Sequence, residues 1–314
     1  MASFASDVRN ELARVIGEDS CCRRAELTAL LRMGGTISFG TKSTFGVNFT
    51  TENAAVARKA LMLLKREIEG VRTEIMVSRT KRLGRNNRYM VRVVPSPQTA
   101  RLLSHTGLMQ SGSLNIGKDM AILRRSCCKA AYLRGAFLGG GSVNRPEAGY
   151  HLELVTGSYA MGELLHKLLR RMRFPVGFTD RKDDYIVYMK EGDAILDFLG
   201  MLQADKAVER MEIARNVKEV RNQVNRLVNC ETANLQKTVD AAGRQLACIR
   251  KLQAANRLES LSDVLREAAD TRLEHPEASL SDLAELLCLS KSAVNHRFRK
   301  LMKMAEELDA EGKE

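Results

Sequence analysis

The segment from Ser290 to Leu301, SKSAVNHRFRKL, carries side chains that can hydrogen-bond to the bases of DNA. If it is helical, Val294, Phe298 and Leu301 share one apolar stripe, and polar residues occupy the opposite face. Asparagine pairs with adenine and arginine with guanine in the major groove. The candidate DNA-binding residues are Lys291, Ser292, Asn295, His296, Arg297, Arg299, Lys300 and Lys303.

Two kinds of contact are expected within this set. The polar face itself, which would read bases, comprises Ser292, Asn295, His296, Arg299 and Lys303. Lys291, Arg297 and Lys300 are better placed for phosphates. His296 alternatively suits a pH-sensitive group or a metal ligand, but no second ligand is evident and we expect no metal. The competing interpretation is a small helical hairpin with a polar face.

The residues before this segment predict a preceding helix and a tight turn. Ser279 is a suitable N-cap, with Asp282 three residues later as a weak capping partner. Ala284 is small where two helices must cross, and Val294 follows ten residues later. This spacing is typical of a helix-turn-helix.

Three leucines, Leu283, Leu286 and Leu287, give that preceding helix its expected apolar face. Cys288 occupies the turn, where glycine is usual, and a cysteine is less comfortable if the turn needs a positive φ. Upstream, residues 261–278 predict another amphipathic helix, which ends at Pro276 and completes a three-helix core.

An internal duplication organises the first two-thirds of the chain. Residues 21–38 (CCRRAELTALLRMGGTIS) align with 127–144 (CCKAAYLRGAFLGGGSVN) at an offset of 106. The match continues, because 49–67 aligns with 154–172. Each copy predicts helix, strand, strand, helix, strand, strand, helix, and therefore an α+β fold of two similar halves.

The first helix of each half ends on glycines and combines small with apolar residues. Small residues on one face let two helices approach closely, so the duplication favours a pair packed at a pseudo-twofold axis. The alternative is two ordinary glycine-terminated core helices.

The seven cysteines fall as two adjacent pairs, Cys21-Cys22 and Cys127-Cys128, and three single residues. No pair has CxxC or zinc-finger spacing. We therefore expect reduced, mostly buried thiols that act as small hydrophobic side chains. We expect no cofactor.

The chain of 314 residues has a net charge of +12, which favours a polyanionic partner. It contains no Trp and few aromatic residues, which argues against RNA binding on an aromatic platform. No apolar run or signal peptide is evident, so we expect a soluble cytoplasmic protein without membrane contact.

Residues 206–257 predict long helices, with breaks around 229–234 and near Asn256. A basic helix here is either a solvated spacer or a DNA contact. The expected organisation is a repeat domain over 1–205 (repeats about 21–107 and 127–203), a helical linker over 206–228, a helix-turn-helix domain over 229–305 and a polar tail over 306–314.

The sequences LTALLRMGG (27–35) and LRGAFLGGG (133–141) resemble degenerate copies of the LAGLIDADG motif of homing endonucleases. In that family the motif helices form the central interface, and an acid at the eighth motif position binds the catalytic metal. Gly34 and Gly140 occupy that position here and cannot ligate a cation. The resemblance therefore implies a two-repeat, LAGLIDADG-like fold without nuclease activity.

The sheets of that family lie along DNA, and one loop of this chain suits such a role. The tip over residues 79–88 holds five basic and no acidic residues, namely Arg79, Lys81, Arg82, Arg85 and Arg88. The equivalent tip over 180–184 is balanced. Any DNA contact by the repeats should be lopsided, although a solvated basic loop is an equal alternative.

Residues 131–154, 221–238 (RNQVNRLVNCETANLQKT) and 290–301 resemble the WhiA family of Gram-positive bacteria. The resemblance covers nearly the whole chain. It implies a nucleoid-associated transcription regulator of cell division, chromosome segregation and, in sporulating lineages, sporulation. In actinobacterial relatives a WhiB-type iron–sulfur protein is a partner.

Double-stranded DNA is thus the expected partner. The alternative function is a chromosome-associated scaffold whose repeat domain binds protein. A third possibility, an active nuclease, conflicts with Gly34 and Gly140. Because an internal pseudo-dimer can act alone, we expect a monomer.

Overall fold

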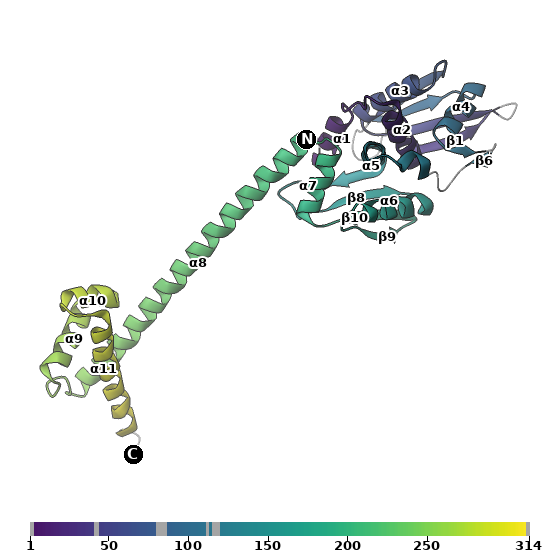
Figure 1. Ribbon diagram of the computed structural model, residues 1–314. Helices are drawn as coiled ribbons and strands as arrows, with labels where there is room; N and C mark the ends of the chain where they lie inside the picture. Colours follow the sequence, from purple (N-terminus) through teal and green to yellow (C-terminus); the bar gives the residue numbers. More distant parts are fainter. Residues whose placement is uncertain (1–2, 41–43, 80–86, 111–112, 115–119, 312–314) are drawn as a thin grey trace. The chain divides into compact units, whose positions relative to one another are not determined.

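The computed structural model describes residues 3–40, 44–79, 87–110, 113–114 and 120–311. The chain divides into two compact units, Met1–Lys218 and Glu219–Glu314. The first unit combines sheets and helices, whereas the second is helical (Figure 1). The prediction of an α+β region followed by an all-α region is confirmed. None of the described helices is both long and apolar enough to span a membrane.

The first repeat has the predicted order of helices and strands. Its elements are α2 (Ser20–Gly34), β1 (Gly35–Phe39), β2 (Phe45–Thr51), α3 (Ala54–Glu67), β3 (Thr73–Arg79), β4 (Asn87–Val93) and α4 (Pro97–His105). The strands form an antiparallel sheet in the order β1-β2-β4-β3. Asn53 caps α3 by accepting from the backbone N–H groups of Ala55 and Val56.

The second repeat reproduces this topology. Its elements are α5 (Ser126–Gly140), β7 (Gly141–Val143), β8 (Leu152–Thr156), α6 (Tyr159–Arg171), β9 (Gly177–Arg181), β10 (Asp184–Met189) and α7 (Gly192–Met201). The strand order β7-β8-β10-β9 matches that of the first sheet. Helix α1 (Phe4–Leu12) precedes the repeats, and β5 (Met109–Gln110), β6 (Ser113–Leu114) and the 3-10 helix η2 (Met120–Leu123) lie between them. The predicted duplication is confirmed.

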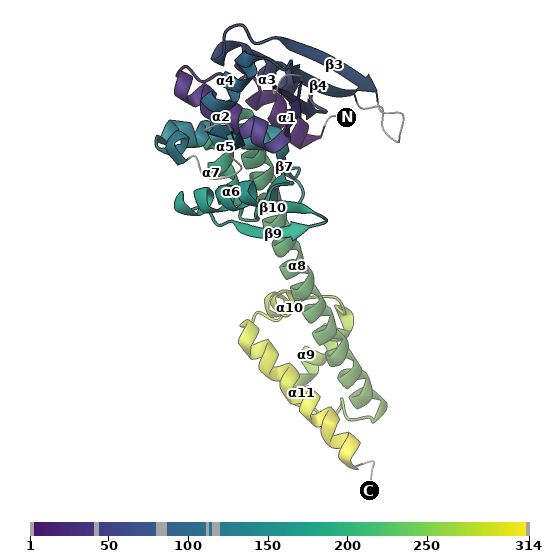
Figure 2. The same cartoon turned by 90° about the vertical axis from the view of Figure 1, so that its right-hand side faces the viewer.

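Helices α2 and α5 pack against each other at the centre of the first unit, as the small residues of their sequences predict (Figure 2). Gly135 makes this approach possible, because a Cβ there would overlap the carbonyl oxygen of Glu26 and lie 3.1 Å from the Cβ of Ala29. The helix-terminal residues Gly34 and Gly140 are followed directly by β1 and β7.

A buried ionic cluster lies in this interface. Glu26 pairs with Lys59 (Oε1–Nζ 2.9 Å) and with Arg134, whose Nε and Nη2 lie 3.2 and 3.3 Å from its two carboxylate oxygens. Lys59 also donates to the carbonyl of Val15, and Arg134 to that of Leu202 (3.4 Å). Burial lowers the pKa of Lys59 despite the nearby Glu26 carboxylate. Sequence patterns gave no sign of this cluster.

Helix α8 (Asp205–Ala254) corrects one expectation about the C-terminal third. The helix continues through residues 229–234, so the predicted break there is wrong. The predicted linker over 206–228 is therefore part of α8 and not a separate helix. Each polar residue in this stretch destabilises the helix by only about 0.7 kcal/mol or less relative to alanine. The stretch contains neither Gly nor Pro, so the helix continues through it. The break near Asn256 is confirmed, since that residue has a φ of 53° just past the helix.

Candidate nucleic-acid interface

Three helices of the second unit build the predicted helix-turn-helix at the C-terminal end of α8. They are α9 (Asp263–Glu274), α10 (Leu280–Leu286) and α11 (Lys291–Glu311). Leu283 and Ala284 of α10 are buried against Val294, Phe298 and Leu301 of α11. The apolar stripe predicted for α11 is therefore confirmed. Three leucines of this segment were expected to face inward, and for Leu286 this prediction is wrong, because its side chain is 54% exposed.

The start of α10 is fixed by a complete capping box. The Ser279 side chain accepts from the backbone N–H groups of Ser281 and Asp282, at 3.2 and 3.3 Å. In return, the backbone N–H of Ser279 donates to the Asp282 carboxylate at 2.8 Å, which lowers the pKa of Asp282. Asp282 is thus a full partner rather than the weak one expected.

The turn between α10 and α11 requires a positive φ, which is the condition under which a cysteine is less comfortable than glycine. Cys288 adopts a φ of 53°, in the left-handed region that usually favours glycine. The backbone N–H of Leu289 closes the turn by donating to the carbonyl of Ala284 at 2.8 Å. Ser290 then caps α11, because its Oγ accepts from the backbone N–H of Ala293 at 3.2 Å. The geometry of the turn therefore sets the direction of α11.

The candidate DNA-binding residues of α11 do not share one environment. Exposed side chains are those of Lys291, Ser292, His296, Arg299, Lys300 and Lys303. Asn295 is half-buried. Arg297 is turned toward α9, where its Nη1 lies 3.1 Å from Glu267 Oε2 and its side chain is 16% exposed. Arg297 is thus bound within the fold, whereas Arg299 faces solvent, a difference that the sequence did not reveal.

Arg272 is a buried residue of this unit that the sequence analysis missed. Its Nη1 donates to the carbonyl of Ala278 at 2.6 Å, and its guanidinium lies 5.4 Å from the ring centroid of Phe298. Burial lowers its pKa. Arg272 thereby ties the end of α9 and the segment before α10 to the core face of α11. A cation four residues before Pro276, where the predicted helix ends, was its only sequence signal.

Residues 215–237 of α8 are all exposed. They hold five basic and two acidic side chains and include most of the segment RNQVNRLVNCETANLQKT. This stretch therefore presents a basic surface, compatible with either the spacer or the DNA contact expected of it.

Both positions that the LAGLIDADG resemblance assigns to catalytic acids have close neighbours. At Gly34, a Cβ would lie 2.8 Å from Cε2 of the Phe49 ring. At Gly140, it would overlap the carbonyl oxygen of Val155 and lie 2.7 Å from Cε of Met33. An acidic side chain at Gly140 would therefore require the backbone to move.

The basic tip of the first repeat is described only at its two ends. Arg79 and Arg88 are exposed at the facing ends of β3 and β4, while Lys81, Arg82 and Arg85 lie outside the described residues. Along β4, Arg88 and Arg92 alternate with the buried Val91 and Val93, so they lie on the open face of the sheet.

The open face of the second sheet carries an acidic side chain. There, Glu153 alternates with the buried Leu152 and Leu154 on β8. Its carboxylate lies 3.4 Å from His151 Nε2. The first sheet likewise places Glu74 opposite Arg92 (Nη1–Oε2 3.7 Å), so each open face carries an acidic residue.

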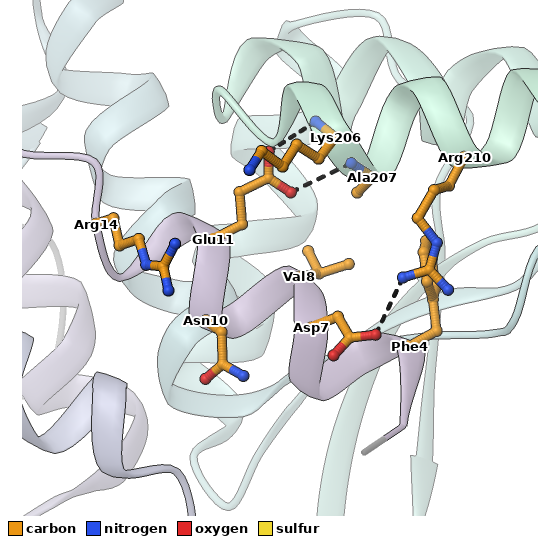
Figure 3. A pocket seen from close by; sticks show the side chains of 9 residues that line it. All are labelled: Phe4, Asp7, Val8, Asn10, Glu11, Arg14, Lys206, Ala207 and Arg210. Carbon is orange, nitrogen blue, oxygen red and sulfur yellow. Dashed lines mark hydrogen bonds and ion pairs between the residues drawn. The ribbon is translucent and has the colours of Figure 1, made fainter. Parts of the chain in front are cut away.

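A hollow of about 420 Å³ lies between α1 and the first turns of α8 (Figure 3). Its polar groups are used by the fold: Glu11 accepts from the backbone N–H groups of Lys206 (2.7 Å) and Ala207 (3.2 Å), capping α8. Arg210 pairs with Asp7 at 3.0 Å. This arrangement anchors the N-terminal helix to α8 and does not resemble a catalytic centre.

Three family models match the chain in succession. They describe the WhiA N-terminal LAGLIDADG-like domain (residues 20–109), the WhiA LAGLIDADG-like domain (129–221) and the WhiA C-terminal HTH domain (224–305). The matched regions correspond to the first repeat, the second repeat and the helix-turn-helix with the α8 segment before it.

Full-length relatives show the same similarity. A probable cell division protein WhiA from Desulforamulus reducens is 47% identical, with 99% of this chain and 98% of the relative covered. The corresponding protein from Desulfitobacterium hafniense is 44% identical at the same coverage.

Two solved structures agree in fold. Full-length WhiA from Thermatoga maritima has a TM-score of 0.61 and 24% identity, with 98% of this chain and 99% of that chain covered. A WhiA N-terminal LAGLIDADG domain has a TM-score of 0.51 and 20% identity, covering 64% of this chain and 91% of that one.

Proposed function

This chain belongs to the WhiA family, and we propose that it is a DNA-binding transcription regulator with a role in cell division. The relatives named as probable cell division proteins support that role. In the same proposal the protein acts on the nucleoid in the cytoplasm, with further roles in chromosome segregation and, in a sporulating host, sporulation. We predict that the protein acts as a monomer and that its partner is double-stranded DNA. A WhiB-type iron–sulfur protein is a predicted partner in actinobacterial relatives.

The observation that carries the proposal is the solvent-facing side of α11. A capped, buried core holds this helix, and its exposed side presents Arg299, His296 and Lys300. Arginine is suited to bidentate contact with guanine in the major groove, and lysine to phosphate contact. We infer that α11 enters a major groove and that Asn295 and Arg299 read bases.

Two arginines on α11 give a matched test of this reading. Arg299→Ala should weaken binding to a specific site by about 1–3 kcal/mol, or roughly 5- to 150-fold. Arg297→Ala, two residues away and with the same charge change, should cost less, because Arg297 is held by Glu267. Genome-wide occupancy mapping would supply the site, and gel-shift titration of the full chain would measure both affinities.

Equal losses for the two variants would indicate a general charge effect rather than reading by Arg299. Unchanged binding of Arg299→Ala would exclude α11 as the reading helix. Circular dichroism of both variants controls for folding, which matters for Arg297→Ala because it removes a contact with α9.

We also propose that the protein cuts no DNA. Metal-assisted cleavage needs oxygen ligands on the ion, and neither Gly34 nor Gly140 has a side chain to provide one. The steric closure at Gly140 supports the same conclusion. Prolonged incubation of the bound site with Mg²⁺ or Mn²⁺ should leave the DNA intact; metal-dependent cleavage that co-purifies with the chain would contradict the proposal.

A protein-binding scaffold is the second candidate for the repeat domain alone. The acidic side chains on the open faces, Glu74 on the first sheet and Glu153 on the second, favour it, because a surface that lies along phosphates is usually cationic. Substitution of the exposed Arg79 and Arg88 by alanine distinguishes the two roles. A smaller salt dependence of DNA affinity would indicate phosphate contacts by the first sheet, and an unchanged one would favour the scaffold.

A further inference from the structure

Four cysteine thiols meet at the N-terminal ends of α2 and α5. Cys21 and Cys22 lie in the first turn of α2, and Cys127 and Cys128 lie at the equivalent positions of α5. Their four Sγ atoms are all within 4.8 Å of one another. The pairs are 106 residues apart, so neither shows a zinc motif alone; the packing of the two helices brings them together.

The expectation that the thiols are mostly buried is wrong. Among the seven cysteines only Cys22 and Cys128 are buried, at 8% and 3% exposure. Cys21 is half-buried, and Cys127, Cys230 and Cys288 are exposed. The four clustered thiols therefore form a site with two ligands shielded by the interface and two reachable from solvent.

We propose that Cys21, Cys22, Cys127 and Cys128 bind a single Zn²⁺ ion in tetrahedral coordination. With Zn–S bonds of about 2.3 Å, a regular tetrahedron of thiolates has edges of about 3.8 Å. The observed limit of 4.8 Å is close enough for small side-chain rotations to reach that geometry. An iron–sulfur cluster places several iron atoms between its thiolates, so it needs a wider cage.

The surroundings suit the charge of such a site. Four thiolates around Zn²⁺ carry a net charge of −2, and both α2 and α5 direct the positive ends of their dipoles at it. Arg125 Nη1 lies 3.7 Å from Cys21 Sγ.

A metal here would join the two repeats through ligands that are distant in sequence. The ion would hold the first turns of α2 and α5 together. Gly34 and Gly140 lie at the opposite ends of the same two helices. Because the site needs both folded helices, binding free energy adds to the stability of the first unit. The zinc site does not depend on DNA binding, and the α11 variants that test DNA binding leave it unchanged.

Cobalt titration of the reduced, metal-free full chain tests the coordination. Co²⁺ should bind at one equivalent per chain and produce the visible d–d and near-ultraviolet charge-transfer bands of a tetrahedral thiolate site, and Zn²⁺ should abolish them. Cys21→Ser/Cys127→Ser removes the two less buried ligands and should weaken binding by at least about 100-fold, more than loss of an outer-shell partner. Cys230→Ser/Cys288→Ser, a control in the second unit, should leave the bands unchanged.

Alkylation of the wild-type chain gives a test that needs no variant. Zn²⁺ should slow modification of Cys127 by at least about tenfold, because a coordinated thiolate is a poor nucleophile. The exposed Cys230 and Cys288 should react equally with and without the ion, as internal controls. Mass spectrometry of peptides would report each cysteine separately.

Three results would overturn the proposal. The first is cobalt binding that persists in Cys21→Ser/Cys127→Ser, folded by circular dichroism. The second is acid-labile sulfide in the purified chain, which would indicate an iron–sulfur cluster. The third is a reduced chain that binds neither Co²⁺ nor Zn²⁺ and forms disulfides between α2 and α5 on oxidation. The four cysteines would then be redox-active thiols rather than metal ligands.

Discussion

The α2/α5 interface and helix α11 use charged side chains in opposite ways. In the interface, Glu26, Lys59 and Arg134 are buried and bonded to one another and to backbone carbonyls. On α11, Arg299 and Lys300 are exposed to solvent. Charges of the first kind hold elements of the fold together, and charges of the second kind remain available to a partner. A net charge therefore indicates a polyanionic partner only after the charges used by the fold are subtracted.

The same two regions also differ in where they place glycine. The interface has Gly135, at a position where a Cβ would overlap the neighbouring backbone. The turn before α11 has Cys288, which keeps a Cβ on a left-handed backbone that would suit glycine. Close packing makes glycine necessary in the first case. In the second, the fold accepts local strain at an exposed position.

Removing the carboxylate of the buried cluster should produce the largest effect. Glu26→Gln leaves the cations of Lys59 and Arg134 buried without a counter-charge, and we expect a loss of about 3–5 kcal/mol in the free energy of unfolding. Urea denaturation of the full chain, followed through the transition of the first unit, would measure it. Binding through α11 should be unchanged under conditions where the variant remains folded.

Lys59→Met is the matched control for that experiment. It removes one buried cation but leaves Glu26 paired with Arg134, so it should cost less than Glu26→Gln. The lowered pKa of Lys59 agrees, because burial already disfavours its charged form. If Lys59→Met destabilised the protein as much as Glu26→Gln, or if neither variant did, the cluster would not be the stabilising contact described above.

Local sequence signals predicted the helix-turn-helix in detail. The capping pair of Ser279 and Asp282, and the ten-residue spacing from Ala284 to Val294, are signals between residues close together in the sequence. The duplication likewise predicted the two sheets and the central helix pair, because each copy repeats the same pattern of turns and apolar residues. The continuity of α8 could not be predicted in the same way, because residues 229–234 include weak helix formers such as Asn and Thr.

Contacts between distant segments could not be predicted. The interaction of Arg297 with Glu267 depends on how α9 crosses α11, and the meeting of Cys22 with Cys128 depends on how α2 crosses α5. Each pairing requires side-chain directions at a helix crossing, which a single sequence does not specify. Aligned cysteine pairs in the two repeats were a usable signal, once the repeats were expected to pack at a pseudo-twofold axis.

The smallest expected effect is at the turn before α11. Cys288→Gly should relieve the left-handed strain, partly offset by the greater freedom of glycine in the unfolded chain, for a net gain of about 1 kcal/mol. Amides of α10 and α11 that exchange by opening of this unit should then exchange about fivefold more slowly with solvent deuterium. Cys288→Ala removes the thiol but keeps the Cβ, so it should show no gain. An equal gain in protection in both variants would mean that the thiol, and not the backbone conformation, is the source of strain in the turn.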